Sequence, residues 1–220
     1  MPTAIIDFET TGLSPTMGDR ATEIAIVLME GGQVVDRFQS LMNAGVHINA
    51  FIESYTGISN AMVRAAPPAE VVMADAARFV GDAPMVAHNA SFDRRFWAAE
   101  LARLDRPAHN PFACTMLLSR RLYPEAGSFR LGSLAAHHGI EFSAQAHRAM
   151  ADADVAARLW ARIVRDMERR YDVHEAPHDF LVKVGGTPKA KMPDAIRRYL
   201  DALGKEQPGL RVKPAMTASL

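Results

Sequence analysis

The 220-residue sequence contains a single cysteine, Cys114, which excludes a disulfide bond within the chain. A chain without disulfides fits a reducing compartment, so we expect a cytoplasmic protein. No run of about 18 apolar residues is present, which argues against a helix that spans a membrane. The N-terminus enters the segment TAIIDFET without the basic and apolar stretches of a secretory signal, so none is expected.

The sequence also lacks an excess of charge, because 25 Lys and Arg residues balance 25 Asp and Glu residues. A broad basic surface for long duplexes is therefore not expected, since nonspecific phosphate affinity accumulates with Lys and Arg. A protein that grips one chain end through metal ions needs few phosphate contacts and is not excluded. No repeat or low-complexity tract occurs, and a hydrophobic content of 49% is ordinary for a globular protein.

Strand patterns occupy the first part of the chain. Residues 3–9 form a short apolar run, and the segments 21–30 and 33–42 are joined by Gly31 and Gly32, a strong hairpin signal. A fourth strand is expected at 84–88. The sheet is therefore expected to form mainly from the N-terminal part of the sequence.

Helical patterns dominate after residue 49. Strands that come first, with helices interleaved later, predict an α/β domain in which helices flank a mixed sheet. We expect this domain to span residues 1–170. The helix expected at 91–105 should have Ser91 as its N-cap. The predicted helical segments are 51–57, 59–66, 69–82, 91–105, 112–122, 130–138 and 148–170.

Residues 171–220 are interpreted as a C-terminal extension. They are slightly basic and contain several prolines, a Gly185-Gly186 pair and one short amphipathic segment at 193–203. A segment of this size can build little hydrophobic core alone. We therefore expect a partly ordered tail or a partner-binding segment rather than an independent domain.

Two carboxylates stand on one face of the first predicted strand. Asp7 and Glu9 are two residues apart, so both side chains leave the face that Ile5 also occupies. Two acids on a buried strand repel each other and lose hydration, which requires compensation by cations or hydrogen bonds. The alternative is that they lie at a fraying strand end.

A third acid, Asp93, falls in the first turn of a predicted helix. It is in register with Trp97 and Leu101, so it shares the side of the helix that faces the core. A favourable interaction with the helix dipole is an alternative explanation for an acid at this position.

The last long helix carries two acids that must face in different directions. Asp152 aligns with the apolar residues Val155 and Leu159, whereas Asp154 aligns with Arg158, for which pairing at i,i+4 is a sufficient explanation. The register therefore selects Asp152 as the acid that points inward.

Four inward-facing acids from three separated segments predict a site of hard oxygen ligands. Such a site suits Mg²⁺ or Mn²⁺ rather than Zn²⁺. Two metal ions about 3.5–4 Å apart stabilise the attacking and leaving oxygens in phosphodiester hydrolysis. His147 stands five residues before Asp152, and an imidazole titrates in the range that suits a general base at neutral pH.

Three motifs in order resemble the DEDDh family of 3′→5′ exonucleases, which includes the proofreading subunit of bacterial DNA polymerase III, ribonuclease T and oligoribonuclease. The matching segments are DFETTG at 7–12, HNASFD at 88–93 and HRAMAD at 147–152. Each motif alone is weak, but the three in family order are specific. The resemblance implies a ribonuclease-H-like fold and release of nucleoside 5′-monophosphates from a free 3′ end.

The resemblance also implies individual roles. It assigns Asp7 to bridging two divalent cations, Glu9 and Asp152 to the cation that carries the nucleophile, Asp93 to the second cation, and His147 to the general base. Other residues match family positions around the terminal nucleotide, and an apolar or aromatic contact there tolerates any base. These expected substrate-binding residues are Thr10, Gly12, Leu13 and Phe92.

One position departs from the family pattern. Proofreading subunits often carry histidine where Thr56 stands in the segment YTGI, so contacts to the terminal nucleotide are expected to differ.

The resemblance favours an exonuclease that acts on single-stranded or frayed 3′ ends, with DNA favoured over RNA, either as a polymerase III epsilon-like proofreading subunit or as a repair enzyme. One alternative is an exoribonuclease that trims RNA ends or short oligoribonucleotides, since no contact to a 2′-hydroxyl can be located. An alternative of another class is a noncatalytic docking module, in which inward-facing, mutually repelling acids have no physical use. By analogy alone, the extension is a candidate segment for binding a polymerase subunit.

Overall fold

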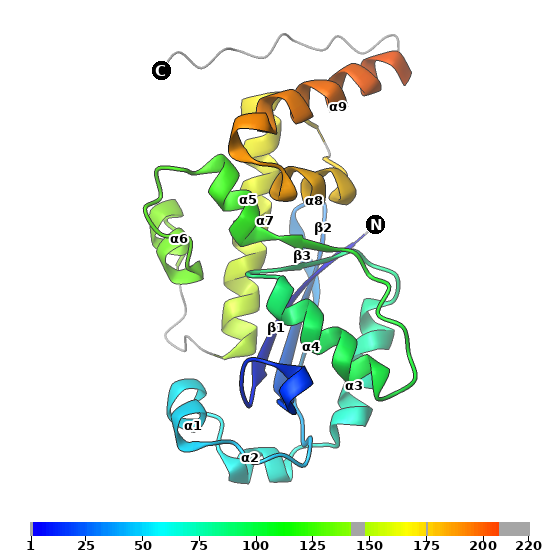
Figure 1. The fold of residues 1–220 in the computed structure, drawn as a ribbon, viewed down its shortest axis with the longest axis vertical. Helices are drawn as coiled ribbons and strands as arrows, with labels where there is room; N and C mark the ends of the chain where they lie inside the picture. The colour runs from blue at the N-terminus through cyan, green and yellow to red at the C-terminus, as the bar shows by residue number, and fades with distance from the viewer. Residues whose placement is uncertain (1, 142–147, 175, 207–220) are drawn as a thin grey trace.

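The computed structural model describes residues 2–141, 148–174 and 176–206. Its centre is a five-stranded sheet in the order β3-β2-β1-β4-β5 (Figure 1). The first three strands are antiparallel, whereas β4 and β5 continue the sheet parallel to β1. This arrangement confirms the predicted mixed sheet. The strands are β1 (Thr3–Thr10), β2 (Ala21–Glu30), β3 (Gln33–Leu41), β4 (Met85–Ala87) and β5 (Phe112–Cys114).

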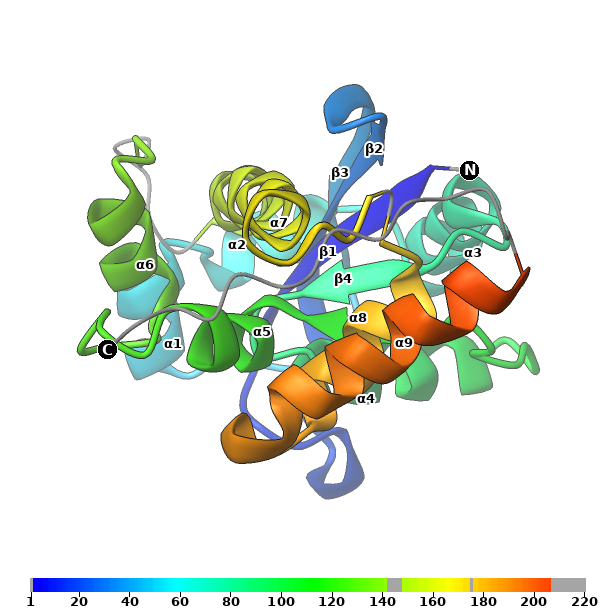
Figure 2. The ribbon, with the colours of Figure 1, turned by 90° about the horizontal axis from the view of Figure 1, so that it is seen from above.

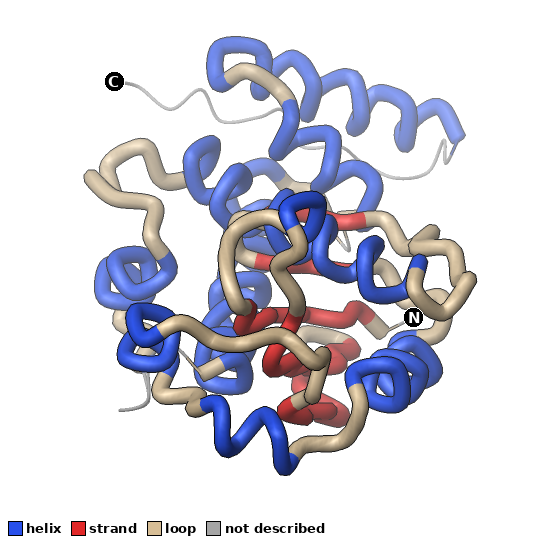
Figure 3. The backbone as a smooth tube through the Cα atoms, turned by 60° about the horizontal axis from the view of Figure 1, so that its bottom comes forward, coloured by secondary structure: helices blue, strands red, loops and turns tan. Residues whose placement is uncertain are grey.

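Helices flank both faces of this sheet (Figures 2 and 3). One face packs on α3 (Ala69–Val80) and α4 (Ser91–Ala102). The other face packs on α7 (Ala149–Tyr171), with α5 (Thr115–Leu122) and α6 (Leu131–His138) beside it. No described helix is long and apolar enough to cross a membrane.

Shorter elements occupy the two ends of the molecule. The helices α1 (Ala50–Thr56) and α2 (Asn60–Ala65) lie at the end opposite to α8 (His178–Gly186) and α9 (Met192–Glu206) (Figure 1). Two 3-10 turns complete the described chain: η1 (Pro15–Met17) follows β1, and η2 (Lys189–Lys191) precedes α9.

Side chains along β1 alternate between the two faces of the sheet, as the sequence predicted. Ala4, Ile6 and Phe8 pack with α3 and α4, whereas Ile5 belongs to the hydrophobic cluster on the α7 side. Because successive strand residues point in opposite directions, Asp7 and Glu9 share the face of Ile5. The strand therefore presents both carboxylates to α7.

The helix predicted over 112–122 is wrong in its first part. Residues Phe112–Cys114 form β5, which pairs in parallel with Met85–Ala87, and α5 begins only at Thr115. A short apolar run does not show by periodicity whether it is a strand or a buried helix. The exposed edge of β4 decides the matter, because it offers backbone hydrogen bonds to an extended neighbour.

The expected N-cap of α4 is also wrong by one residue. The cap is Ala90, and Ser91 is already the first residue of the helix. Asn89 has a left-handed backbone with φ of 67°, and its carbonyl accepts a hydrogen bond from the amide of Phe92 at 2.9 Å. This tight turn starts the helix one residue earlier than the side-chain pattern indicates.

Part of the C-terminal extension packs on the hydrophobic cluster that contains α7. The amphipathic segment predicted at 193–203 lies within α9, whereas α8 was not predicted. His178 donates from Nε2 to the Met85 carbonyl at 2.8 Å, which ties the start of α8 to β4. The division of the chain near residue 170 stays a prediction. The cluster residues from this segment are Phe180, Leu181, Val184, Met192, Ile196 and Leu200.

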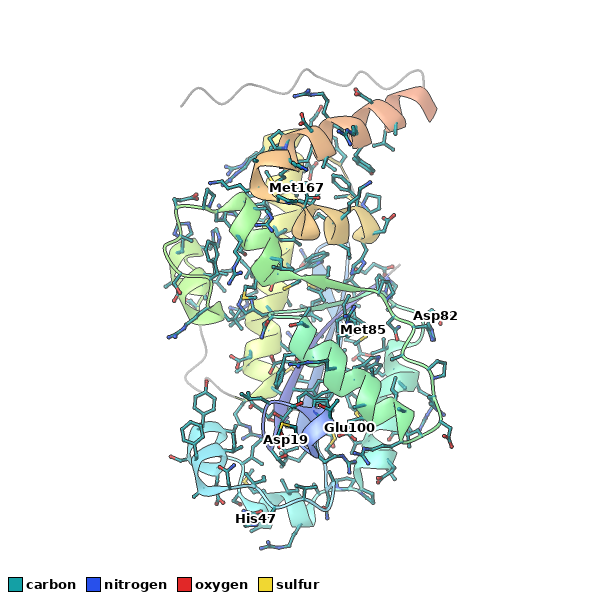
Figure 4. All side chains as sticks on the ribbon, viewed as in Figure 1. Asp19, His47, Asp82, Met85, Glu100 and Met167 are labelled. Atoms are coloured by element: carbon teal, nitrogen blue, oxygen red, sulfur yellow. The ribbon has the colours of Figure 1, made fainter. Side chains whose placement is uncertain are left out.

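A buried ion pair holds the chain between β1 and β2. Arg20 donates from Nε and Nη2 to the two carboxylate oxygens of Glu100 at 2.9 and 2.8 Å, and the Ala21 amide donates to the same carboxylate at 3.1 Å. Glu100 belongs to α4, and Figure 4 places it with Asp19 beside η1. The pair therefore fastens the loop after β1 to the helix that carries Asp93.

We expect Glu100→Ala to lower the free energy of unfolding by about 3–5 kcal/mol, because it leaves a buried guanidinium without its partner. Urea denaturation of the full chain measures this loss. The control is Asp75→Ala, which removes the exposed partner of Arg78 in α3 and should change stability by less than about 0.5 kcal/mol. Equal losses for the two variants would contradict the anchoring role of Glu100.

Candidate active site

Three carboxylates converge where β1 meets the first turn of α7. One oxygen each from Asp7, Glu9 and Asp152 lies within 4.8 Å of the other two. β1 contributes Asp7 and Glu9 through strand parity, and α7 contributes Asp152 because this helix packs across β1 and β2. Carboxylate oxygens at this spacing fit a divalent cation.

Asp93 approaches the site from the opposite face of the sheet. Its side chain is only 2% exposed, and Oδ1 accepts a hydrogen bond from the Phe8 amide at 3.3 Å. This amide lies beyond the residues of β1 that pair with β4, so the carboxylate takes the place of a strand partner. Among the described residues, Asp93 is outside the three-ligand group, but its charge acts strongly on Asp7.

Burial and mutual repulsion raise the pKa values of these acids. Loss of hydration, followed by repulsion from Asp93 and Glu9, raises the pKa of Asp7 well above its usual range. Burial, with Asp152 and Glu23 nearby, raises the pKa of Glu9 to about 8. Burial likewise raises the pKa of Asp93. A divalent cation would favour the charged forms of all these groups, so its binding would displace the protons that they hold and offset the repulsion among them.

The predicted directions of Asp152 and Asp154 are confirmed, but the predicted partner of Asp154 is not. Asp152 points into the carboxylate group and Asp154 does not, as the helix register predicted. The expected partner of Asp154 is wrong, however: Asp154 pairs with Arg37 of β3 at 3.0 Å, while Arg158 donates to the Glu141 carbonyl. Helix periodicity identifies the outward face but not which strand lies opposite it.

His147, the expected general base, lies outside the described residues. Its neighbour Arg148 is the residue that precedes α7. The role of His147 therefore stays a prediction that rests on its spacing from Asp152 and on the family resemblance.

Thr10 and Gly12 shape the loop that follows β1. The Thr10 hydroxyl donates to the Gly12 carbonyl at 2.6 Å. A Cβ atom on residue 12 would lie 2.4–2.5 Å from the Asp19 carboxylate, which accepts the Ser14 amide at 2.9 Å. A larger residue at position 12 would therefore displace the Asp19 carboxylate from the Ser14 amide, and the loop leaves Leu13 77% exposed.

The other residues expected near a terminal nucleotide differ in their surroundings. Phe92 is half-buried, and its ring lies 4.9 Å from the ring of the buried Phe96. Thr56 is buried and uses its hydroxyl locally, donating to the Ile52 carbonyl at 2.9 Å and accepting from the Ile58 amide at 3.1 Å. Its neighbour Tyr55, rather than Thr56, faces the cleft beside the acids.

A cleft of about 1430 Å³ adjoins the acids. Asp7 and Asp152 line it together with Tyr55, and the segment 127–133, which runs from the connection after α5 into the first turn of α6, forms another wall. Arg120 also lines this cleft, with its guanidinium 5.7 Å above the Phe129 ring. The cleft thus combines an acidic end with exposed arginine and aromatic side chains, a composition suited to a nucleic acid strand.

His88 holds one wall of this cleft. Its ring nitrogens lie 2.9 Å from the Thr115 hydroxyl and 2.9 Å from the Phe129 carbonyl. Because a carbonyl only accepts, Nε2 carries the proton and Nδ1 accepts from Thr115. Burial lowers the pKa of His88 to about 4, so the ring stays neutral and acts as a structural hydrogen-bonding group.

Glu23 and Arg148 adjoin the acids but were not predicted from the sequence. Glu23 of β2 is the strand partner of Glu9, is 1% exposed and pairs with Arg148 at 2.8 Å. A signal was present, because Glu23 is the one acid inside the apolar run of residues 21–29. The cleft residues Tyr55, Arg120 and Phe129 carried no comparable signal.

The central strand of this mixed sheet thus presents paired acids to a flanking helix. A family model described as Exonuclease, RNase_T, matches residues 4–160. The chain therefore belongs to the RNase_T exonuclease family, and the resemblance to DEDDh-type 3′→5′ exonucleases with a ribonuclease-H-like fold is confirmed.

Relatives in sequence are much longer than this chain. It is 38% identical over 172 residues to the PolC-type DNA polymerase III of Oceanobacillus iheyensis, covering 77% of the chain and 12% of the relative. The corresponding polymerase of Bacillus subtilis is 37% identical over 164 residues, covering 74% and 11%. The match thus covers about one eighth or less of these polymerases.

Solved structures with the same fold include two exonucleases. Exonuclease X in complex with 5′ overhanging duplex DNA has a TM-score of 0.62 and 27% identity, covering 88% of this chain and 99% of that one. Exonuclease I of E. coli in complex with a dT13 oligonucleotide has a TM-score of 0.67 and 21% identity, covering 78% and 42%. The second likeness concerns the fold alone.

The raised pKa of Glu9 predicts how stability depends on pH without metal. Between about pH 4.5, the ordinary value, and about 8, the folded protein keeps a proton that the unfolded chain has released. Raising the pH through this window therefore destabilises the folded state. Thermal unfolding in excess chelator measures this effect. We expect the stability of wild type to fall relative to that of Glu9→Gln as the pH rises from 5 to 8. A difference that is constant or shrinks would contradict the raised pKa.

Proposed function

We propose that this chain removes nucleotides from the 3′ ends of single-stranded or frayed DNA, using two divalent cations, Mg²⁺ or Mn²⁺. The observation that carries the proposal is the meeting of Asp7, Glu9 and Asp152 beside a cleft of about 1430 Å³, with Asp93 acting on Asp7 from the opposite face of the sheet. These four residues are the proposed metal ligands. Bound cations would supply charge stabilisation at the attacking and leaving oxygens.

The protein itself supplies positioning and proton transfer. Each ligand stands on a strand or helix, and the Phe8 amide orients the Asp93 carboxylate. His147 is the proposed acceptor of a proton from the attacking water, supported by its place just before the residues that open α7. A rigid set of ligands limits reorganisation during the reaction.

The terminal nucleotide is proposed to lie between the loop after β1 and α4. Leu13 is supported as a base contact by its exposure, and Phe92 by its half-buried ring beside Phe96. Thr10 and Gly12 are supported mainly as residues that shape the loop. Stacking and apolar contacts of this kind would accept any base.

The choice of DNA rests on similarity. The sequence relatives are DNA polymerases, and the structure of Exonuclease X contains duplex DNA with an overhang. These likenesses favour proofreading or repair of DNA, in the cytoplasm, and association with a polymerase subunit through the C-terminal extension. Trimming of RNA ends is the alternative that the experiments below separate.

A matched pair of substitutions tests the assignment of ligands. We expect Asp152→Asn to lower hydrolysis by at least about 10²-fold, whereas Asp154→Asn, two residues further along α7, should keep activity within about twofold. The reason is that Asp152 joins the carboxylate group while Asp154 pairs with Arg37 at the surface. Single-turnover cleavage of a labelled oligonucleotide measures both. Loss of activity in the two variants alike would argue against the assignment.

Substitutions of the central ligand and of the base test the mechanism. Asp7→Ala should abolish hydrolysis, and His147→Ala should lower the rate by about 10²–10⁴-fold, the span of a general base. The wild-type enzyme in excess chelator serves as the comparison. Persistent cleavage by Asp7→Ala, or by wild type with chelator, would overturn the metal mechanism.

Matched single-stranded DNA and RNA, labelled at the 5′ end, separate the substrate alternatives. With Mg²⁺ or Mn²⁺, a descending ladder from DNA and little product from RNA is expected. The reverse preference would favour an exoribonuclease, and internal cuts alone would refute an exonuclease. No cleavage of either substrate would favour a docking module.

A further inference from the structure

The ion pair of the buried Glu23 and the half-buried Arg148 joins the middle of the sheet to the start of α7. The Glu23 carboxylate accepts hydrogen bonds from Nε and Nη2 of Arg148 at 3.1 and 2.8 Å. It also accepts from Nε2 of Gln39 at 2.9 Å and from the Ala149 amide at 3.2 Å. Four donors on one carboxylate, which is 1% exposed, make this a fixed joint rather than a surface contact.

This joint lies against the proposed ligands from two directions. Glu23 stands opposite Glu9 in the register of β1 and β2, and its charge raises the pKa of Glu9. Asp152 follows one turn after Arg148, and its amide donates to the Arg148 carbonyl at 3.2 Å. A shift of Arg148 would therefore move the first turn of α7 and Asp152 with it.

The guanidinium of Arg148 lies near two acids, Glu23 and Glu9. Among the described residues, its hydrogen bonds go to Glu23, while its charge lowers the pKa of Glu9 without a hydrogen bond to it. A freed guanidinium could pair with Glu9, and a carboxylate in such a pair is a poorer ligand for a cation. The contacts of Glu23 hold Arg148 away from that arrangement.

We propose that Glu23 and Arg148 are positioning residues for the metal site. Arg148 fixes the start of α7 and therefore Asp152, and Glu23 retains the guanidinium so that Glu9 stays available to a divalent cation. This inference rests on the proposed function, because it assigns to the pair a role at the same carboxylates. Partners of metal ligands commonly change metal affinity by about 10- to 100-fold when they are removed.

A second ion pair in the chain provides a matched control. Arg37 of β3 and Asp154 of α7 join the same helix to the neighbouring strand of the same sheet, at 3.0 Å. The side chains of this pair are 50% and 30% exposed, and the pair lies outside the carboxylate group. If the Glu23 pair served only to dock α7 on the sheet, loss of either pair would affect metal binding in the same way.

The test measures binding of Mn²⁺ to the full chain by calorimetry, without nucleic acid, together with kcat and KM on single-stranded DNA. We expect Glu23→Gln to weaken Mn²⁺ binding by about 10-fold or more and to lower kcat at limiting Mn²⁺, with KM for DNA within about twofold. Arg37→Met should bind Mn²⁺ as wild type does. Wild-type binding by Glu23→Gln, or equal weakening in both variants, would overturn the proposal.

A double variant separates retention of the guanidinium from simple loss of structure. Because Glu23→Gln/Arg148→Met has no guanidinium to compete for Glu9, it should bind Mn²⁺ more tightly than Glu23→Gln alone, although kcat stays low. Additive weakening would overturn the retention argument. If Glu23→Gln does not fold, Arg148→Lys and Arg148→Met are compared instead. Arg148→Lys should weaken Mn²⁺ binding less than Arg148→Met does. Equal weakening by these two variants would count against the proposal.

The Glu23 and Asp7 variants distinguish failure of the positioning role from failure of the proposed function. Wild-type behaviour of the Glu23 variant, with an inactive Asp7→Ala, would remove the positioning role and leave the exonuclease function intact. An active Asp7→Ala enzyme would instead overturn the function from which the inference starts.

Discussion

Repulsion among carboxylates around the end of β1 is the constraint on which the rest of this structure depends. Asp7, Glu9 and Asp152 bring their oxygens together, and Asp93 adds a buried acid from the opposite side. Loss of hydration and like charge both oppose this arrangement. The surrounding fold has to hold the acids in place before any cation can compensate their charge.

The scaffold does so by giving each acid a rigid support and a defined partner. β1 is the central strand of the sheet and cannot shift without breaking its pairing with β2 and β4. Asp93 is fastened by the Phe8 amide, and Arg148 is fastened by Glu23. Outside the acids, the Arg20–Glu100 pair links the loop of Leu13 to the helix of Asp93. Ligand geometry and loop geometry are thus set by connected contacts.

Much of this arrangement could be predicted from the sequence because two periodicities are local. A period of two along β1 places Asp7 and Glu9 on one face, and the helical period separates Asp152 from Asp154. The hairpin at Gly31 and Gly32 follows from the positive φ values that glycine accepts readily, 57° and 78° here.

Other features depend on contacts between distant segments, and local patterns could not reveal them. Residues 112–114 are a strand because β4 lies beside them, and Asp154 pairs with Arg37 because β3 lies opposite α7. The burial of Glu23 and its choice of Arg148 depend on a contact across 125 positions. For the four proposed ligands, the inward direction could be read from the sequence alone, because side-chain direction follows from the backbone period. Which groups surround these ligands depends on tertiary contacts, because hydrogen-bond partners and loss of hydration arise when remote segments pack together.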